Sequence, residues 1–101
     1  MSKASTPEGK IKARLSRALK AEKVWYFCPQ AGIYGVAGIP DFIAIAGGQF
    51  IGIECKADGS KKPTALQVLR MSQIEKAGGK CFVVYDDETI EQVMLWIRFK
   101  K

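Results

Sequence analysis

The sequence contains no histidine among its 101 residues. This absence excludes Ser-His-Asp and Cys-His catalysis, HExxH zinc sites and nucleases that use a histidine as general base. Any chemistry at a site in this chain must therefore be done by carboxylates, lysine or a bound metal ion.

Long apolar runs and paired cysteines are also lacking. No apolar run reaches the roughly 18 residues that span a bilayer, and residues 1–10 lack the apolar centre of a signal peptide. We therefore expect a soluble, cytoplasmic protein without a membrane partner. Cys28, Cys55 and Cys81 form no Cys-x-x-Cys pair, and their apolar neighbours predict buried thiols rather than a disulfide or zinc framework.

Positive charge and apolar residues are plentiful. Sixteen lysines and arginines against ten acidic residues give a formal charge of +6, which favours a polyanionic partner, nucleic acid before an anionic membrane surface. The apolar share of 48% suits one compact core. We expect residues 1–101 to form a single domain.

The residue patterns predict three helices and four strands in the order α-β-β-β-α-β-α. A helix starts at Thr6-Pro7 and runs to about Glu22, and a Gly-rich segment at 29–38 is expected to be a mobile loop. The other predicted elements are a strand at 24–28, a hairpin of 42–46 and 49–55 about Gly47-Gly48, a helix at 64–77, a buried strand at 81–86 and a last helix capped by Asp86 or Asp87. Both hairpin faces are apolar, so we expect an α/β fold in which a mixed central sheet is covered by helices on two sides.

Three charged residues interrupt the apolar hairpin. A two-residue turn at Gly47-Gly48 pairs Asp41 with Glu54, and Lys56 projects to the same face. Two facing carboxylates repel each other unless a cation neutralises them, and Mg²⁺ prefers such oxygen ligands. A lysine beside the ion can orient a metal-bound water or neutralise developing charge.

Two structural alternatives apply to these charges. Lys56 could simply form an ion pair with Glu54 or Asp41 at a wet strand end, although three charges on a doubly covered face cost several kcal/mol of desolvation. Glu8 lies within the apolar stripe of the first helix. It is either a first-turn glutamate stabilised by the helix dipole or a carboxylate directed inward.

Pro40-Asp41 followed by Glu54-Cys55-Lys56 resembles the signature of the PD-(D/E)XK nuclease superfamily. More narrowly, Gly38 to Asp41, the Gly-Gly hairpin, Gln67 and Gly78-Gly79 resemble the VRR-NUC family over most of the chain. The resemblance implies a restriction-endonuclease-like core, α-β-β-β-α-β with a C-terminal helix. It also implies similarity to stand-alone phage and bacterial members, which resemble homodimeric Holliday-junction resolvases.

The resemblance implies a metal-dependent endonuclease that cuts branched, flapped or four-way junction DNA. Mg²⁺ or Mn²⁺ would be held by Asp41, Glu54 and the backbone carbonyl of Cys55, with Glu8 reaching it directly or through water. Lys56 would position and activate the attacking water, and Gln67 would support that lysine or the scissile phosphate. By spacing alone, Gln67 fits a solvated helix edge equally well. No organic cofactor is implied, and a phage-encoded member would act in the host cytoplasm.

Basic residues offer a surface for the DNA backbone. They lie around the exposed side of the first helix and in the loop after the ExK strand: Lys10, Lys12, Arg14, Arg17, Lys20, Lys61 and Lys62. Binding through them would weaken as salt rises; alternatively, these side chains are only solvated. No base-specific element is present in the pattern, which favours recognition of DNA shape.

Symmetric cutting of a four-way junction needs two sites related by a two-fold axis, so we expect a homodimer. Val68, Met71, Leu95 and Trp96 either supply the dimer contact or pack within the monomer. Three other functions stay open: a non-catalytic nucleic-acid-binding module on the same fold, an RNA-directed nuclease, and a structural or inhibitory protein-interaction domain.

Overall fold

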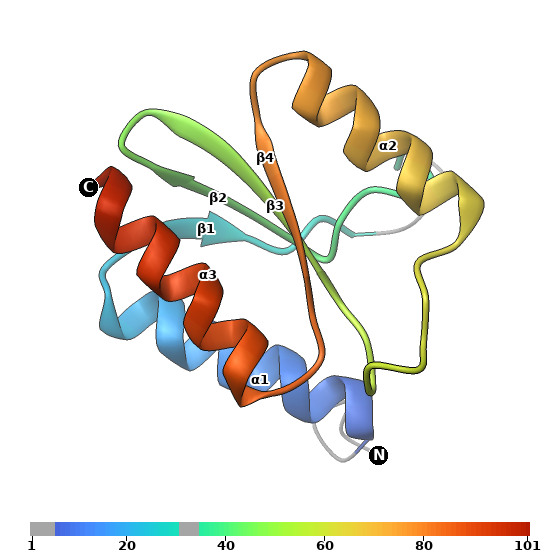
Figure 1. The fold of residues 1–101 in the computed structure, drawn as a ribbon, viewed down its shortest axis with the longest axis horizontal. Helices are drawn as coiled ribbons and strands as arrows, with labels where there is room; N and C mark the ends of the chain where they lie inside the picture. The colour runs from blue at the N-terminus through green and yellow to red at the C-terminus, as the bar shows by residue number, and fades with distance from the viewer. Residues whose placement is uncertain (1–5, 31–34) are drawn as a thin grey trace.

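The computed structural model describes residues 6–30 and 35–101. Within these residues the element order confirms the predicted α-β-β-β-α-β-α arrangement (Figure 1). The elements are α1 (Pro7–Ala21), β1 (Trp25–Phe27), β2 (Phe42–Ala46), β3 (Gln49–Cys55), α2 (Ala65–Lys76), β4 (Lys80–Val84) and α3 (Asp87–Lys100). Two expectations fall partly outside the described residues. The absence of a signal peptide at 1–10 includes residues 1–5, and the mobile loop at 29–38 includes residues 31–34.

The four strands form one mixed sheet in the order β1-β2-β3-β4. β1 and β3 pair antiparallel with β2, whereas β4 pairs parallel with β3, as the strand-helix-strand order predicts. The hairpin register runs from Phe42 opposite Ile53 to Ala46 opposite Gln49. Gly47 and Gly48 both adopt positive φ, 58° and 76°, which a two-residue hairpin turn of this kind requires. The predicted register is therefore confirmed.

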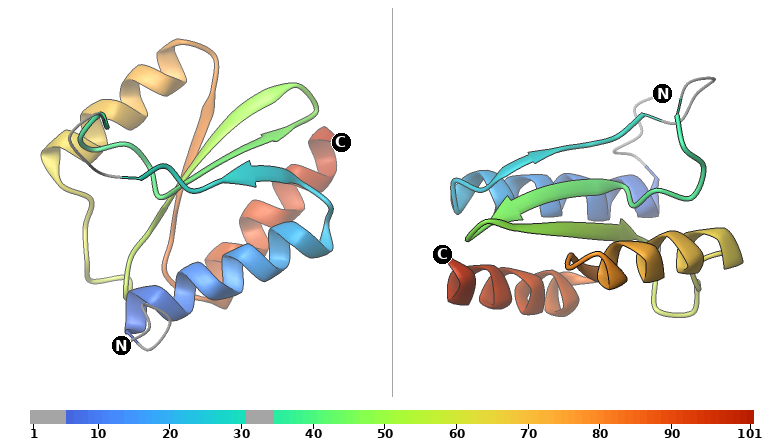
Figure 2. Two further views of the ribbon diagram at one scale, coloured as in Figure 1. Left: turned by 180° about the vertical axis from the view of Figure 1, so that it is seen from behind. Right: turned by 90° about the horizontal axis from the view of Figure 1, so that it is seen from above.

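α1 and α3 lie side by side and cover one face of the sheet (Figures 1 and 2). Each helix begins at a side-chain cap: Thr6 Oγ1 accepts from the Gly9 amide at 3.0 Å, and Asp86 Oδ1 accepts from the Thr89 amide at 2.8 Å. Their apolar stripes pack on the inward side chains of β2, β3 and β4. The buried helix residues of this core are Ile11, Leu15, Leu19, Ile90, Val93, Met94 and Ile97.

The opposite face of the sheet is only partly covered. α2 contacts β4 and has no buried residue. Four large side chains on β1 and near the hairpin turn remain 42–60% exposed, and we call them the open patch: Trp25, Phe27, Ile45 and Phe50. The expectation that helices cover both faces of the hairpin is thus wrong at the turn end, because α2 lies over β4 and does not extend across to β1 and β2.

Two further expectations of burial are wrong. β4 is the last strand of the sheet and, among the described residues, has no neighbouring strand on one side, so within it only Val84 is fully buried. Cys28 follows the short edge strand β1 and is exposed, and Cys81 on β4 is half-buried; only Cys55 is buried as predicted. All three thiols are free. In the described part of the chain, no helix combines the length and the apolar character needed to cross a membrane.

Candidate active site

Asp41 and Glu54 meet at the open end of the β2–β3 hairpin, as the register predicts. The Asp41 amide donates to Glu54 Oε1 at 3.2 Å, and the Cys55 amide donates to Asp41 Oδ2 at 2.8 Å. Each carboxylate is therefore held by the main chain on the opposite side of the hairpin. This reciprocal pairing fixes both side chains without using their remaining oxygens.

Pro40 fixes the position of Asp41 by close packing. Its side chain is fully buried, and it lies against Gly52 of β3, where an added Cβ would come within 2.9 Å of Pro40 Cγ. Proline also restricts the preceding residue, Ile39, to extended backbone. The chain entering β2 is consequently rigid at the point where the first carboxylate leaves it.

Glu54 is the most unusual residue of the site because it is only 1% exposed. Its Oε2 atom has no hydrogen-bond partner among the described residues, and the nearest ammonium, Lys56 Nζ, lies 3.7 Å away. Burial, together with the Asp41 side chain through its hydrogen bonding and negative charge, raises the pKa of Glu54 to about 8, although Lys56 and the Asp41 amide act in the opposite direction. A buried carboxyl with an unsatisfied oxygen is costly unless a cation joins it.

Lys56 is held by the start of α2. Its Nζ donates to Gln67 Oε1 at 2.9 Å, and the same oxygen accepts from the Thr64 amide at 2.9 Å. The Gln67 amide in turn donates to Thr64 Oγ1, which completes a capping box. Gln67 is thus half-buried against the lysine rather than solvated at a helix edge. The spacing Thr64-x-x-Gln67 is the sequence signature of such a capping box, and it is the signal that could have predicted this position of Gln67.

Lys12 of α1 also belongs to the site. Its Nζ lies 3.3 Å from Glu8 Oε2 and 3.5 Å from Asp41 Oδ1. Partial burial lowers the pKa of Lys12, but Asp41 and Glu8 more than offset this effect, so the pKa is raised and the ammonium persists. The expectation that Lys12 lies on the exposed face of the helix is wrong, because the N-terminal half of α1 is packed beside Asp41. Glu8 faces the site through Lys12.

The donor set fits a hard divalent cation. Asp41 Oδ1 and Glu54 Oε2 face lysines instead of backbone donors, and the orphaned Oε2 atom is the clearest place for positive charge. Two carboxylates with backbone, water or substrate oxygens suit Mg²⁺ or Mn²⁺. Across residues 6–30 and 35–101, no group of three or more His, Cys, Asp and Glu side chains is arranged to hold a metal. The side chain of Cys55 packs into the core, so only its carbonyl could contribute.

The remaining basic residues predicted to bind nucleic acid are not brought into the site. They are exposed along α1 and in the loop after β3: Lys10, Arg14, Arg17, Lys61 and Lys62. Arg14 pairs with Asp87 of α3 at 3.5 Å.

A pocket that the sequence patterns did not predict opens beside Asp41. It is lined by Pro29, Gln30 and residues 35–41. Asp41, the first of the two carboxylates, is thus part of the lining of this pocket.

We compared the sequence with models of known protein families and with curated proteins. Neither comparison found a match. The function must therefore be inferred from the site itself.

Proposed function

We propose that this protein is a metal-dependent endonuclease with restriction-endonuclease-like topology, similar to the VRR-NUC members of the PD-(D/E)XK superfamily. It hydrolyses phosphodiester bonds in branched, flapped or four-way junction DNA inside the cell. The supporting observation is the fully buried Glu54, whose Oε2 lacks a hydrogen-bond partner within the described structure while Asp41 and Lys56 lie beside it.

The residues take distinct roles in this proposal. Asp41, Glu54 and the Cys55 carbonyl would hold Mg²⁺ or Mn²⁺, and the ion would neutralise phosphate charge and make a bound water more acidic. Lys56, anchored by Gln67 at 2.9 Å, orients the attacking water and stabilises negative charge that develops on the phosphoryl oxygens. Histidine is not needed for any of these steps.

The partner in this proposal is DNA, held mainly through its phosphates. The formal charge of +6 and the exposed cations of α1 and of the loop after β3 support non-specific backbone binding. Among the residues predicted to bind DNA, only Lys12 lies in the site. Affinity is therefore expected to fall steeply as salt rises.

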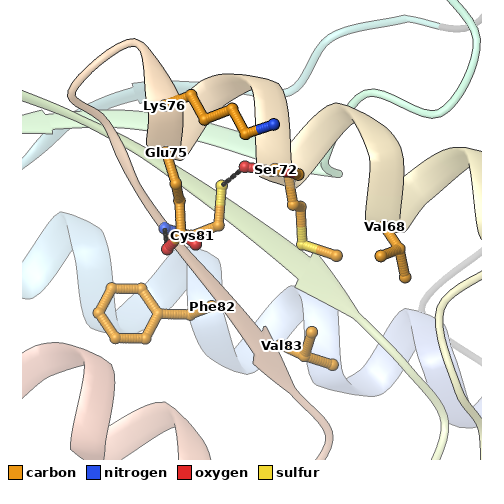
Figure 3. Close-up of a pocket in the computed structure, with 8 residues that line it drawn as sticks. Val68, Ser72, Glu75, Lys76, Cys81, Phe82 and Val83 are labelled. Carbon is orange, nitrogen blue, oxygen red and sulfur yellow. Dashed lines mark hydrogen bonds between the residues drawn. The ribbon is translucent and has the colours of Figure 1, made fainter.

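We also propose that two copies act together through the β4 edge. Two side chains predicted for a dimer contact lie on the flanks of this strand: Val68 is 52% exposed on α2 and Leu95 is 53% exposed on α3. Trp96 instead packs within the chain, edge-on against Phe82. Figure 3 shows the pocket that opens between α2 and β4 beside Val68. An unpaired edge strand flanked by exposed apolar side chains supports pairing with a second copy.

The dimer is tested by measuring molar mass in solution by light scattering. Val68→Glu is expected to convert dimers into monomers, because it places a charge in the contact. Leu69→Glu is the matched control: Leu69 is 49% exposed on the same helix but does not line the pocket. A monomeric wild-type protein, or equal masses for both variants, would contradict the interface.

The nuclease is tested with labelled four-way junctions, flaps, duplexes and RNA, each incubated with Mg²⁺ or Mn²⁺. We expect metal-dependent cutting of the branched DNA, reduced at least ~10²-fold by Glu54→Ala or Lys56→Ala. Lys101→Ala, which removes a charge at the C-terminal end of α3 and outside the surface predicted to bind DNA, is the control for net charge. Binding without cleavage that neither site substitution changes would indicate a binding module, and preferred cleavage of RNA would indicate an RNA nuclease. Indifference to both metal and salt would indicate a protein-interaction domain.

A further inference from the structure

Lys12 is the structural link between the two acidic groups on either side of it. Its ammonium bridges Glu8 of α1 and Asp41 at the start of β2, with N to O distances of 3.3 and 3.5 Å. Asp41 Oδ2 is already used by the Cys55 amide, so the oxygen that faces Lys12 is Oδ1. This is the same atom that remains for a metal ion.

The side chain is placed to move. Lys12 is 35% exposed and Glu8 is 44% exposed, whereas Glu54 is 1% exposed and Lys56 is 13% exposed. The site therefore has a fixed cation, Lys56, enclosed with Glu54 and tied to Gln67, and a second cation at its solvent side. A lysine ammonium has no acceptor capacity and a flexible four-carbon stem, so it can leave one carboxylate for another partner.

We infer that Lys12 is a resident counter-cation that occupies the Asp41 side of the site until a divalent metal displaces it, and that it then becomes available to a phosphate of the nucleic acid. This inference rests on the proposed metal-dependent function. It assigns to Lys12 a regulatory role: it lowers the affinity of the empty site for metal and couples metal binding to nucleic-acid binding.

The sign of the effect follows from charge. A cation within 4 Å of Asp41 opposes a divalent ion on the same carboxylate, both by repulsion and by competition for Oδ1. Removing it with Lys12→Met, which keeps most of the length of the side chain, should tighten Mn²⁺ binding about 3- to 10-fold. DNA that the protein cannot cut should raise the Mn²⁺ affinity of the wild-type protein more than that of Lys12→Met. The reason is that only the wild-type protein has a Lys12 ammonium that can leave Asp41 and pair with a phosphate.

The test is calorimetric titration of Mn²⁺ into the wild-type protein, Lys12→Met, Lys12→Arg and Glu54→Gln, without DNA. Lys20→Met is the charge-matched control on the same helix. We expect tighter binding only in Lys12→Met, near wild-type affinity in Lys12→Arg and Lys20→Met, and loss of binding in Glu54→Gln. Wild-type binding that Lys12→Met leaves unchanged or weakens would overturn the inference but leave the metal site intact. No Mn²⁺ binding by the wild-type protein would overturn both.

A second measurement on the wild-type protein covers the case in which Lys12→Met does not fold. The side-chain NMR signals of Lys12 and Lys20 are followed as Mg²⁺ is added. Displacement predicts a shift for Lys12 and none for Lys20. Equal responses from the two lysines would overturn the inference.

Discussion

The two ends of the β2–β3 hairpin reverse the usual pattern, in which apolar side chains are buried and charged side chains are exposed. At the open end, Glu54 carries a carboxylate and is 1% exposed. At the turn end, Ile45 and Phe50 are apolar and are 45% and 42% exposed. Strand alternation places all three side chains on the same face of the sheet.

The covering elements explain this difference. The starts of α1 and α2 close over the charged end through Lys12 and Gln67, whereas near the turn α2 lies over β4 and does not extend across to β1 and β2. Stability alone would favour the reverse arrangement, since burying apolar side chains is favourable and burying a carboxylate is costly. The buried charge therefore makes the hairpin less stable than an apolar side chain at the same position would. Such a destabilising group is expected at a functional site.

Glu54→Gln tests the charged end and should have the largest effect. The cleavage rate should fall at least ~10²-fold, because the amide is a poor metal ligand and cannot neutralise the ion. The same substitution should stabilise the metal-free protein above pH 8. Cleavage assays and thermal unfolding of the same preparations measure both effects.

The pH dependence of that stability has a definite sign. The pKa of Glu54 is raised from 4.5 to about 8 in the folded protein, so the folded state binds this proton more tightly than the unfolded state. Its contribution to stability is present below pH 4.5 and is lost as the pH rises through 8. Glu54→Gln should thus match the wild type near pH 4 and exceed its Tm by on the order of 10 °C or more near pH 9 in metal-free buffer. A Tm difference that does not change with pH would contradict the assigned cause.

Ile43 and Ile45 test where the covering ends, because they lie two residues apart on the same strand and face. Ile43 is 4% exposed and Ile45 is 45% exposed. Ile43→Ala should cost about 2–4 kcal/mol of unfolding free energy, whereas Ile45→Ala should cost less than ~1 kcal/mol. Urea denaturation measures both. Equal costs would mean that the turn end is covered in solution.

Gln67 tests how the charged end is closed and should have the smallest effect. Gln67→Ala removes the capping box of α2 and the acceptor for Lys56, so we expect a loss of about 1 kcal/mol in stability and about tenfold in cleavage rate. Gln67→Glu keeps an acceptor for both the Thr64 amide and Lys56 and should retain most of both properties. If the two variants behave alike, the acceptor oxygen is not what holds the lysine.

Much of the hairpin could be predicted because its determinants are local. Gly47-Gly48 sets a two-residue turn, the turn sets the register, and the register brings Asp41 to Glu54. The open patch could not be predicted, since an apolar strand face does not reveal how far a helix from elsewhere in the chain extends over it. Lys12 was misplaced for the same reason: a helical wheel gives its angle on α1 but not the strand end that lies beside it. Its spacing of four residues from Glu8 was the available signal.

The amides of Asp41 and Cys55, which hold the two carboxylates, have a further consequence for how this site is inherited. Because both donors belong to the main chain, any descendant that keeps the hairpin keeps them, and within these two positions only proline would remove one. This main-chain part of the support therefore leaves no signature in side-chain identity, unlike the packing of Pro40 against Gly52. Related chains could diverge widely around Asp41 and Glu54 and still aim both carboxylates in the same way.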